Sequence, residues 1–498
     1  MTRKSKLMLN FATSLAYQLV TLVCGFVLPR FFLGYYGSSV NGLVSSITQF
    51  LGLISFCELG VGAVVQSALY APLASKDDDG ISAVVVSSER FFRRVGWIFC
   101  VYVGVLCVVY PLVVMDEYDF LFTALLIGAI SVSSFAQYFF GMTYRLLLNA
   151  DQLGFVQFTI HTVTIILNTV ISILLMQGGA GVQLVKLVSS LIFILQPLAM
   201  MLVCRRLYRI NRSVVITGEP IKQKWNGVAQ HVAVVVHGNV GTAVLTLTST
   251  LENVSVFAVY NLVATGLWQI FSSFTGGVQA LIGNMIAQGE KKELDSFFGK
   301  VERLVHLAVT VVFLCMGFLI VPFVRVYTDG INDAEYQRPL FAVLFTLATA
   351  LFCLRAPYNQ AILAAGHYKQ TQRSAFIEAG ITLGLSIVLS PFFDLVGIAV
   401  ALLVAKAYRL VYFVVYLSGN ILERSPSHFI KNLILDLIGG GAAMLVLLVF
   451  PSFFSLGAVS YIGWILLAIK VFAVSALAAS AVHFIAFFTT DRRKTRVA

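Results

Sequence analysis

Apolar stretches of about twenty residues recur along the whole chain, and short polar segments separate them. A helix needs roughly 20 mainly apolar residues to cross the hydrocarbon core of a bilayer. The sequence has 498 residues, of which 59% are hydrophobic and 11% are charged, whereas about a quarter of the residues in a soluble domain are charged. These features predict an all-α polytopic membrane protein.

About fourteen apolar windows are long enough to span a membrane, and each boundary carries an error of a few residues. They cover residues 8–29, 41–66, 95–115, 120–144, 157–177, 181–203, 228–250, 255–286, 304–324, 340–364, 375–392, 396–418, 432–451 and 460–488. The first window leads directly into the second, so we expect it to be a retained helix and not a cleaved signal peptide.

The positive charges lie mainly on one side of this predicted topology. The net charge is +11, which alone could suggest a nucleic-acid partner. If the N-terminus is cytoplasmic, however, most Lys and Arg residues fall in cytoplasmic segments, as the positive-inside rule requires. We therefore expect an inner-membrane protein with both termini in the cytoplasm, and no nucleic-acid partner.

Motifs of enzymatic chemistry are missing from the sequence. It contains no P-loop, HExxH or GxSxG pattern, which argues against ATP hydrolysis, zinc chemistry and serine chemistry. The seven cysteines have no CxxC spacing, so the sequence predicts no metal site. We expect no cofactor, although a coupling cation, either H⁺ or Na⁺, is left open.

The two halves of the chain resemble each other. NGLVSSITQF at 41–50 aligns with NLVATGLWQI at 261–270, SERFFRR at 88–94 aligns with VERLVHL at 301–307, and YRLLLN at 144–149 aligns with YNQAIL at 358–363. Several matches at nearly constant spacing indicate an internal repeat. Two six-helix lobes of the same orientation, followed by two further helices, account for the predicted spans.

This organisation gives four predicted segments. They are an N-lobe at 1–210, a cytoplasmic linker at 211–227, a C-lobe at 228–420, and two C-terminal helices with a basic tail at 421–498.

Four consecutive stretches near the N-terminus carry a family resemblance: PRFFLGYYGSSVNGL, SSITQFLGLISFCELGVGAVVQSALYAPLA, KDDDGIS and SERFFRR. They resemble the N-terminal region of bacterial Wzx-type oligosaccharide flippases, a MATE-like branch of the multidrug/oligosaccharidyl-lipid/polysaccharide exporter superfamily. The resemblance implies a two-lobe transporter with a central cavity. Its substrate would be an undecaprenyl-pyrophosphate-linked sugar repeat for O-antigen, capsule or exopolysaccharide, and its partners the bilayer and other polysaccharide-assembly membrane proteins.

Charged residues inside the spans suit an anionic substrate. Such charges normally face protein or water because exposure to lipid costs about 2.5–3.5 kcal/mol each. The six cations outnumber the three acids and are Arg30, Lys186, Arg355, Lys406, Arg409 and Lys470; the acids are Glu58, Glu378 and Asp436. The surplus is positive, and arginine can grip phosphate oxygens through two N–H groups.

Each charge also has a structural interpretation. Arg30 could snorkel to the headgroups, and for Lys186 and Arg409 we expect snorkelling. Arg355 and Lys406 are predicted to face a cavity or to form an ion pair inside the membrane. Glu58 could bind a coupling cation or pair with an arginine, and Lys470 could pair with Asp436.

Polar side chains recur on one face of three predicted helices. Spacings of three and four residues place them on one helical face. The faces comprise Asn41, Ser45, Thr48, Gly52 and Ser55; Gln157, His161, Thr164, Asn168 and Ser172; and Asn261, Thr265, Trp268, Ser272 and Thr275. Gln49 and Gln269 match each other in the repeat. Helix packing would explain one such face, but matching faces in both halves favour a shared cavity.

These sequence features bear on four possible functions. A lipid-linked oligosaccharide flippase working by alternating access is favoured, and a lipid II flippase is a close alternative. A cation-coupled multidrug exporter would be expected to hold carboxylates in its first and seventh spans, which contain none. A glycan polymerase would be expected to have a large outer loop, and every predicted outer loop is short.

Overall fold

A computed structural model of the chain describes residues 3–58, 60–214, 228–457 and 459–495. Within these ranges the regular elements are helices, and no strand occurs. Eleven helical segments of the described chain are long and apolar enough to cross a membrane. The predicted all-α polytopic fold is therefore confirmed.

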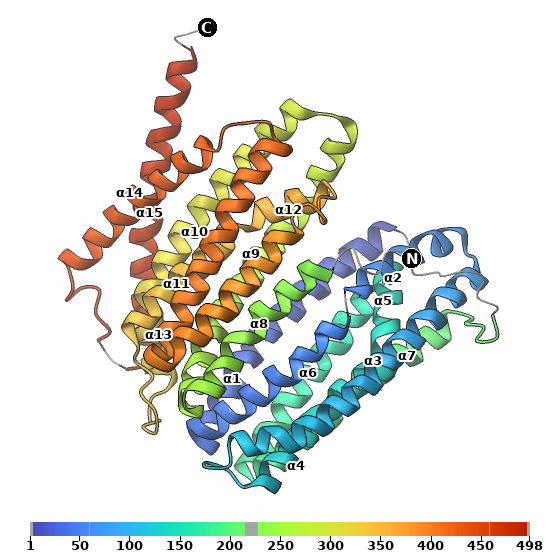
Figure 1. Cartoon of the computed structure of the whole chain (residues 1–498). Helices are drawn as coiled ribbons and strands as arrows, with labels where there is room; N and C mark the ends of the chain where they lie inside the picture. Colours follow the sequence, from blue (N-terminus) through green and yellow to red (C-terminus); the bar gives the residue numbers. More distant parts are fainter. Residues whose placement is uncertain (1–2, 59, 215–227, 458, 496–498) are drawn as a thin grey trace. The chain divides into compact units, whose positions relative to one another are not determined.

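The chain divides into two compact units, Met1–Asn239 and Val240–Ala498, with the boundary inside helix α8 (Val228–Thr248). Figure 1 colours the first unit from blue to green and the second from green to red. Of the linker predicted at 211–227, residues 215–227 lie outside the described residues. The four predicted segment boundaries remain predictions.

Unit 1 is a bundle of helices around the contact between α1 and α6, with α7 packed on α4 and α6. Asp77 caps the N-terminus of α3 by accepting a hydrogen bond from Gly80 N at 2.9 Å, and Asp119 caps α4 through Leu121 N at 3.0 Å. Such caps satisfy backbone N–H groups that have no partner inside the helix. The elements are α1 (Arg3–Gly52), η1 (Leu53–Glu58), α2 (Val61–Ser75), α3 (Asp78–Val113), α4 (Phe120–Ala136), η2 (Gln137–Gly141), α5 (Met142–Ala150), α6 (Gly154–Gln177) and α7 (Val182–Leu207).

Unit 2 repeats this order of elements. The 36-residue α3 corresponds to the 37-residue α10, and the broken pair α4–α5 corresponds to α11–α12. The counterpart of α6 and α7 is α13, in which the non-helical backbone of Asp394 separates two helical parts. The elements are α9 (Leu251–Gln288), α10 (Lys291–Tyr327), α11 (Pro339–Leu354), α12 (Ala356–Ala364), α13 (Gln372–Asn420), α14 (Ser427–Val449) and α15 (Tyr461–Thr495).

Two elements each join two helices across a bend, which accounts for part of the difference between the eleven long helical segments and the fourteen predicted spans. The 50-residue α1 bends at Gly37, with φ 78° and ψ 177°, and the 49-residue α13 bends at Asp394, with φ 45°. Glycine adopts positive φ without a steric penalty. The unusual backbone at Asp394 is held by Ser249, whose hydroxyl donates to Asp394 Oδ1 at 2.7 Å. The two parts of α13 correspond to the predicted spans 375–392 and 396–418, whereas α1 contains the first predicted span and only the beginning of the second.

The predicted second span, 41–66, does not form one helix. α1 ends at Gly52, a 3-10 helix follows over Leu53–Glu58, and α2 begins at Val61. Gly60 has a φ of 71°, a value that favours glycine and interrupts a helix. The polar stretch at 41–50 is thus the last part of α1.

The bend in α13 should be sensitive to a single added methyl group at Gly397. A Cβ atom there would lie 2.6 Å from both the carbonyl carbon and the oxygen of Leu389. We expect Gly397→Ala to lower the free energy of unfolding by about 1–3 kcal/mol, the usual range for an overpacked site.

Thermal unfolding in detergent measures this effect, and Gly384→Ala in the same helix is the matched control. A Cβ at Gly384 meets nothing within 4 Å. Equal unfolding temperatures for the two variants would contradict the steric account of the bend.

The last two helices form an antiparallel pair that packs on α10, as Figure 1 shows for α14 and α15. Leu319 of α10 lies in one apolar cluster with Leu447 of α14 and Leu467 of α15. Trp464 Nε1 also donates to Leu319 O at 3.2 Å. The predicted appendix of two C-terminal helices is therefore attached to unit 2 through α10.

Candidate functional site

Four charged side chains gather in unit 2 and form what we call the cation cluster: Arg355, Glu378, Lys406 and Arg409. Arg355 lies at the break between α11 and α12, and the other three lie on α13. Arg355 Nη1 donates to Glu378 Oε1 at 2.5 Å, and Arg409 Nη1 lies 3.4 Å from Glu378 Oε2. One carboxylate thus bridges two guanidinium groups.

Two aromatic rings complete the cation cluster. The Phe352 ring contacts Arg355 and Lys406, whose charged groups lie 4.6 and 5.1 Å from its centroid. The Phe413 ring lies 4.5 Å from the Arg409 guanidinium. Cations are attracted to the faces of aromatic rings, and more strongly where water is excluded. The rings hold the cations in place without neutralising them.

The cation cluster carries more positive than negative charge. Glu378 supplies one negative charge against three cations, and Arg409 and Lys406 are only 2% and 4% exposed. Buried charge of one sign is costly unless a counter-ion approaches. The arrangement can therefore accept an anion.

The expectations for these four residues were met unevenly. Arg355 forms the intramembrane ion pair considered for it, and Lys406 lies at the same Phe352 ring; a cavity role for either stays a prediction. The expectation that Arg409 snorkels is wrong, because its side chain is buried against Glu378 and Phe413. The signal for it was the shared face of Lys406, Arg409 and Phe413, which are three and four residues apart.

The polar residues predicted on α9 reach the cation cluster through one aromatic contact. Trp268 packs on Phe352 with ring centroids 4.4 Å apart. Asn261 and Gln269 are half-buried, and Thr265 is exposed. The side chain of Thr275 lies outside the described residues.

In unit 1 the predicted polar face of α6 lies partly against α1. The rings of His161 and Tyr17 have centroids 5.7 Å apart. His161 Nε2, Gln157 Oε1 and Thr21 Oγ1 are buried and have no hydrogen-bond partner among the described residues. Buried polar atoms normally have partners, so these three suit a polar ligand group or water.

The remainder of that α6 face is satisfied within the helix. Thr164 donates to Ile160 O at 2.6 Å, and Ser172 donates to the side-chain oxygen of Asn168 at 3.4 Å. Asn168 is 4% exposed. The part of this face from Thr164 to Ser172 therefore serves helix packing in the observed structure.

The other predicted site residues of unit 1 lie outside the α6 face. Asn41 is buried in the last part of α1, whereas Ser45, Gln49 and Arg30 are half-buried. Glu58 accepts a hydrogen bond from Tyr138 Oη at 2.7 Å, and not from an arginine as considered. The predicted wall shared by the α1 and α9 faces involves both units and remains a prediction.

Lys186 and Lys470 also contact aromatic rings. Lys186 Nζ lies 4.4 Å from the Phe32 ring centroid. Lys470 Nζ lies 4.3 Å from the Phe453 ring centroid and donates to Phe453 O at 3.2 Å. The pairing considered between Lys470 and Asp436 is therefore wrong, and Asp436 instead bonds two histidines that the sequence analysis did not single out.

Each unit also contains a tyrosine, a glutamate and an arginine that bind one another. In unit 1, Glu89 Oε1 accepts from Tyr144 Oη at 2.7 Å and from Arg212 Nη2 at 3.4 Å. The charge of Glu89 raises the pKa of the Arg212 guanidinium above its ordinary value. We call this group the unit 1 clamp, because it attaches the segment after α7 to α3 and α5.

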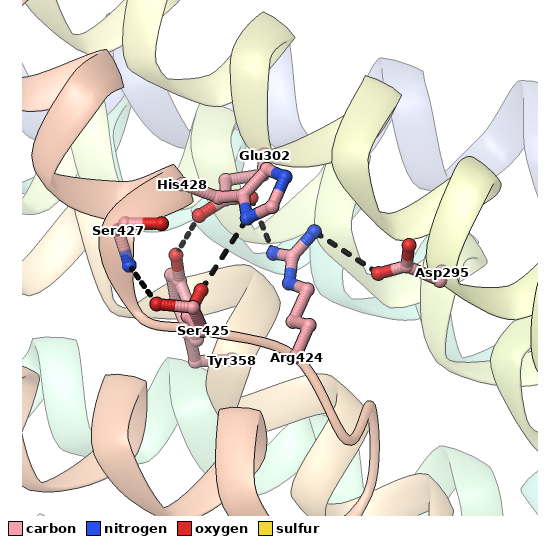
Figure 2. A network of polar contacts seen from close by, with 7 residues as sticks. All are labelled: Asp295, Glu302, Tyr358, Arg424, Ser425, Ser427 and His428. Atoms are coloured by element: carbon pink, nitrogen blue, oxygen red, sulfur yellow. Dashed lines mark hydrogen bonds and ion pairs between the residues drawn. The ribbon is translucent and has the colours of Figure 1, made fainter.

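The same three residue types recur in unit 2, and Figure 2 shows this unit 2 clamp. Glu302 accepts from Tyr358 and, at 2.5 Å, from Arg424 Nη2. The glutamates, tyrosines and arginines of the two clamps lie 213, 214 and 212 residues apart. The internal repeat therefore extends to a specific polar contact.

The two clamps differ in burial. The side chains of Arg424 and Glu302 are 9% and 2% exposed, whereas those of Arg212 and Glu89 are 57% and 15% exposed. Arg424 also reaches Asp295 Oδ1 at 3.3 Å. The unit 2 clamp is thus an interior network, and the unit 1 clamp is partly solvated.

Comparison with solved structures agrees with this architecture. The chain is similar to the lipid II flippase MurJ in an inward closed conformation, with a TM-score of 0.70, 14% identity, and coverage of 97% of this chain and 100% of that one. It is also similar to an inward-facing MATE family multidrug resistance transporter of the MOP superfamily, with a TM-score of 0.54, 15% identity, and coverage of 81% and 95%.

A third similar structure is a MOP superfamily transporter from Pyrococcus furiosus, with a TM-score of 0.53, 14% identity, and coverage of 84% and 95%. No protein-family model matches the sequence, and no curated protein matches it. At these identities the likeness concerns the fold alone.

Proposed function

We propose that the chain is a flippase that moves polyprenyl-pyrophosphate-linked oligosaccharides from the cytoplasmic to the outer leaflet of the bacterial inner membrane by alternating access. The product would serve surface polysaccharide synthesis, and both termini would be cytoplasmic. The cation cluster is the observation that carries the proposal. Three cations around one carboxylate, inside an apolar helical unit, match the charge of a pyrophosphate.

Physical chemistry separates the two parts of such a substrate. The polyprenyl tail can remain in the bilayer, but the charged and hydroxylated head cannot cross hydrocarbon unaided. Arg355 and Arg409 offer planar N–H groups that suit phosphate oxygens, and Lys406 adds a compact charge.

A lipid II flippase is the second candidate. The likeness to MurJ spans nearly the whole chain and includes the C-terminal helices, with a TM-score of 0.70. Lipid II also presents a polyprenyl pyrophosphate, so the cation cluster suits both. A multidrug exporter is less well supported, because a cluster with surplus positive charge would repel cationic drugs.

A flipping assay in proteoliposomes tests the proposed function. Lys406→Met keeps an unbranched apolar side chain beside Phe352 and removes the charge. A hydrogen bond to a charged group contributes about 1.5–3 kcal/mol, so the variant should flip a polyprenyl-pyrophosphate-linked oligosaccharide about ten to a hundred times more slowly. Arg325→Gln, at an exposed arginine of α10, is the control and should match the unmodified protein.

The same vesicles test substrate choice, because the transport rates of the two lipids can be compared in them. Faster transport of the oligosaccharide lipid than of lipid II supports the first candidate, and the reverse order supports the second. If neither lipid is flipped, the proposed function is wrong.

A further inference from the structure

Two histidines and one aspartate meet where the C-terminal helices pack on α10. His306 of α10 bonds Asp436 Oδ2 of α14 through Nδ1, and His483 of α15 bonds Asp436 Oδ1 through Nε2 at 3.1 Å. The side chains of His306, Asp436 and His483 are 1%, 11% and 5% exposed. Each comes from a different helix, and we call the group the histidine–aspartate cluster.

The geometry assigns the hydrogen bonds of this cluster. An ionised carboxylate only accepts, so each ring must donate an N–H to its own carboxylate oxygen. The Thr310 hydroxyl also bonds Asp436. One nitrogen of each ring is directed at a carboxylate oxygen, and the described residues contain no group arranged to hold a metal ion. The contacts that join the three side chains are therefore hydrogen bonds and not metal–ligand bonds.

The charge of the histidine–aspartate cluster depends on one proton. With both rings neutral it carries one negative charge in an apolar setting. One added proton makes an imidazolium–carboxylate pair with no net charge, and burial favours the state without net charge. Two ring nitrogens are free to take that proton, because His306 Nε2 and His483 Nδ1 are buried and have no hydrogen-bond partner among the described residues.

The described charged side chains near the histidine–aspartate cluster are either paired with other groups or exposed. On α10, Glu302 lies one turn from His306, but Arg424 already pairs with it and Tyr358 of α12 donates to it. Arg303 of α10 is exposed. The Phe429 ring of α14 lies 5.1 Å from the His306 ring and 6.0 Å from the Tyr358 ring.

The other helices packed here bring no counter-charge among their described side chains. On α14, His428 and Lys431 are exposed. On α15, Lys470 donates to Phe453 O, and α11 contains no charged residue. A proton is the ligand that this site can take.

We propose that His306, Asp436 and His483 form a proton-binding site inside the membrane region, and that its bound proton holds helices α14 and α15 against α10. Loss of the proton leaves a buried anion between the three helices, which weakens their contact. The proposal does not depend on which lipid the protein transports.

Helix α10 connects the histidine–aspartate cluster to the cation cluster. His306 and Glu302 lie four residues apart on one face of α10, and Glu302 binds Tyr358 of α12. Arg355 of the cation cluster directly precedes α12. Loss of the proton from the histidine–aspartate cluster can therefore affect the cation cluster through helices α10 and α12.

Proton uptake by the full-length protein in lipid nanodiscs tests the proposal directly. Titration from pH 8 to pH 5 should bind one proton fewer per chain in Asp436→Asn than in the unmodified protein. The double variant His306→Gln/His483→Gln should lose the same proton. Asp116→Asn, at an exposed aspartate in the loop after α3, is the matched control and should not change the uptake.

Hydrogen–deuterium exchange of the unmodified protein gives a readout that needs no variant. After correction for the intrinsic exchange rate, α14 should exchange at least several-fold more slowly at pH 6 than at pH 8, while α3 changes little. Equal proton uptake by the unmodified protein and Asp436→Asn, or pH-independent protection of α14, would overturn the proposal.

Discussion

Glu302→Gln is expected to destabilise unit 2 by about 3–5 kcal/mol, the range for breaking a buried ion pair by removing one partner. Glu302 is 1% exposed and binds both Tyr358 and Arg424. Its replacement leaves the Arg424 guanidinium buried, with Asp295 as its one remaining charged partner among the described residues. Cleavage of unit 2 by protease during a thermal ramp, followed by mass spectrometry, measures the loss in that unit.

Glu89→Gln is the matched control, because it makes the same chemical change at the corresponding position of unit 1. Arg212 is more than half exposed there, and exposed ion pairs contribute about 0–1 kcal/mol. The control should therefore have a small effect. Similar losses in the two variants would show that burial does not distinguish the two clamps.

The two clamps also show how far the repeat could be read from sequence. The alignment matched Glu89 with Glu302 and Tyr144 with Tyr358, since both pairs lie within recognisable helical segments. It did not match Arg212 with Arg424. These arginines lie in connecting segments after α7 and α13, where sequence similarity is weak and only the folded chain brings them to the glutamates.

Hydrophobic periodicity predicted the helical fold well, and the gaps between predicted spans at 30–40 and 393–395 contain the bends at Gly37 and Asp394. The prediction was wrong at 41–66, where Gly60 and a 3-10 helix interrupt a continuous apolar window.

The sequence predicted only part of the candidate site, because the remaining contacts depend on how the helices extend and pack. Arg409 was placed near the end of a span, but α13 continues to Asn420, so an extended side chain from Arg409 remains inside the unit. His306 and His483 were missed because isolated histidines have no sequence pattern. Their role depends on three helices meeting at Asp436, which is a tertiary contact.

Glu378→Gln gives the second large expected effect, and it tests whether the cation cluster receives phosphate. Glu378 bridges Arg355 and Arg409, so its neutralisation leaves three cations, of which Lys406 and Arg409 are buried, without this carboxylate. We expect a loss of about 3–5 kcal/mol, again as for a broken buried ion pair. Thermal unfolding in detergent measures this loss.

A ligand that replaces the missing negative charge should restore much of that stability. A polyprenyl pyrophosphate at a hundred times its dissociation constant would contribute about 2.7 kcal/mol. Because the site in Glu378→Gln lacks its internal anion, the ligand should bind this variant more tightly and raise its unfolding temperature more than that of the unmodified protein. The matched ligand is the polyprenol with the same tail and no phosphate, which should stabilise both proteins equally. If the polyprenol restores Glu378→Gln as well as the pyrophosphate does, the cation cluster does not recognise phosphate, and the proposed role of Arg355, Lys406 and Arg409 is wrong.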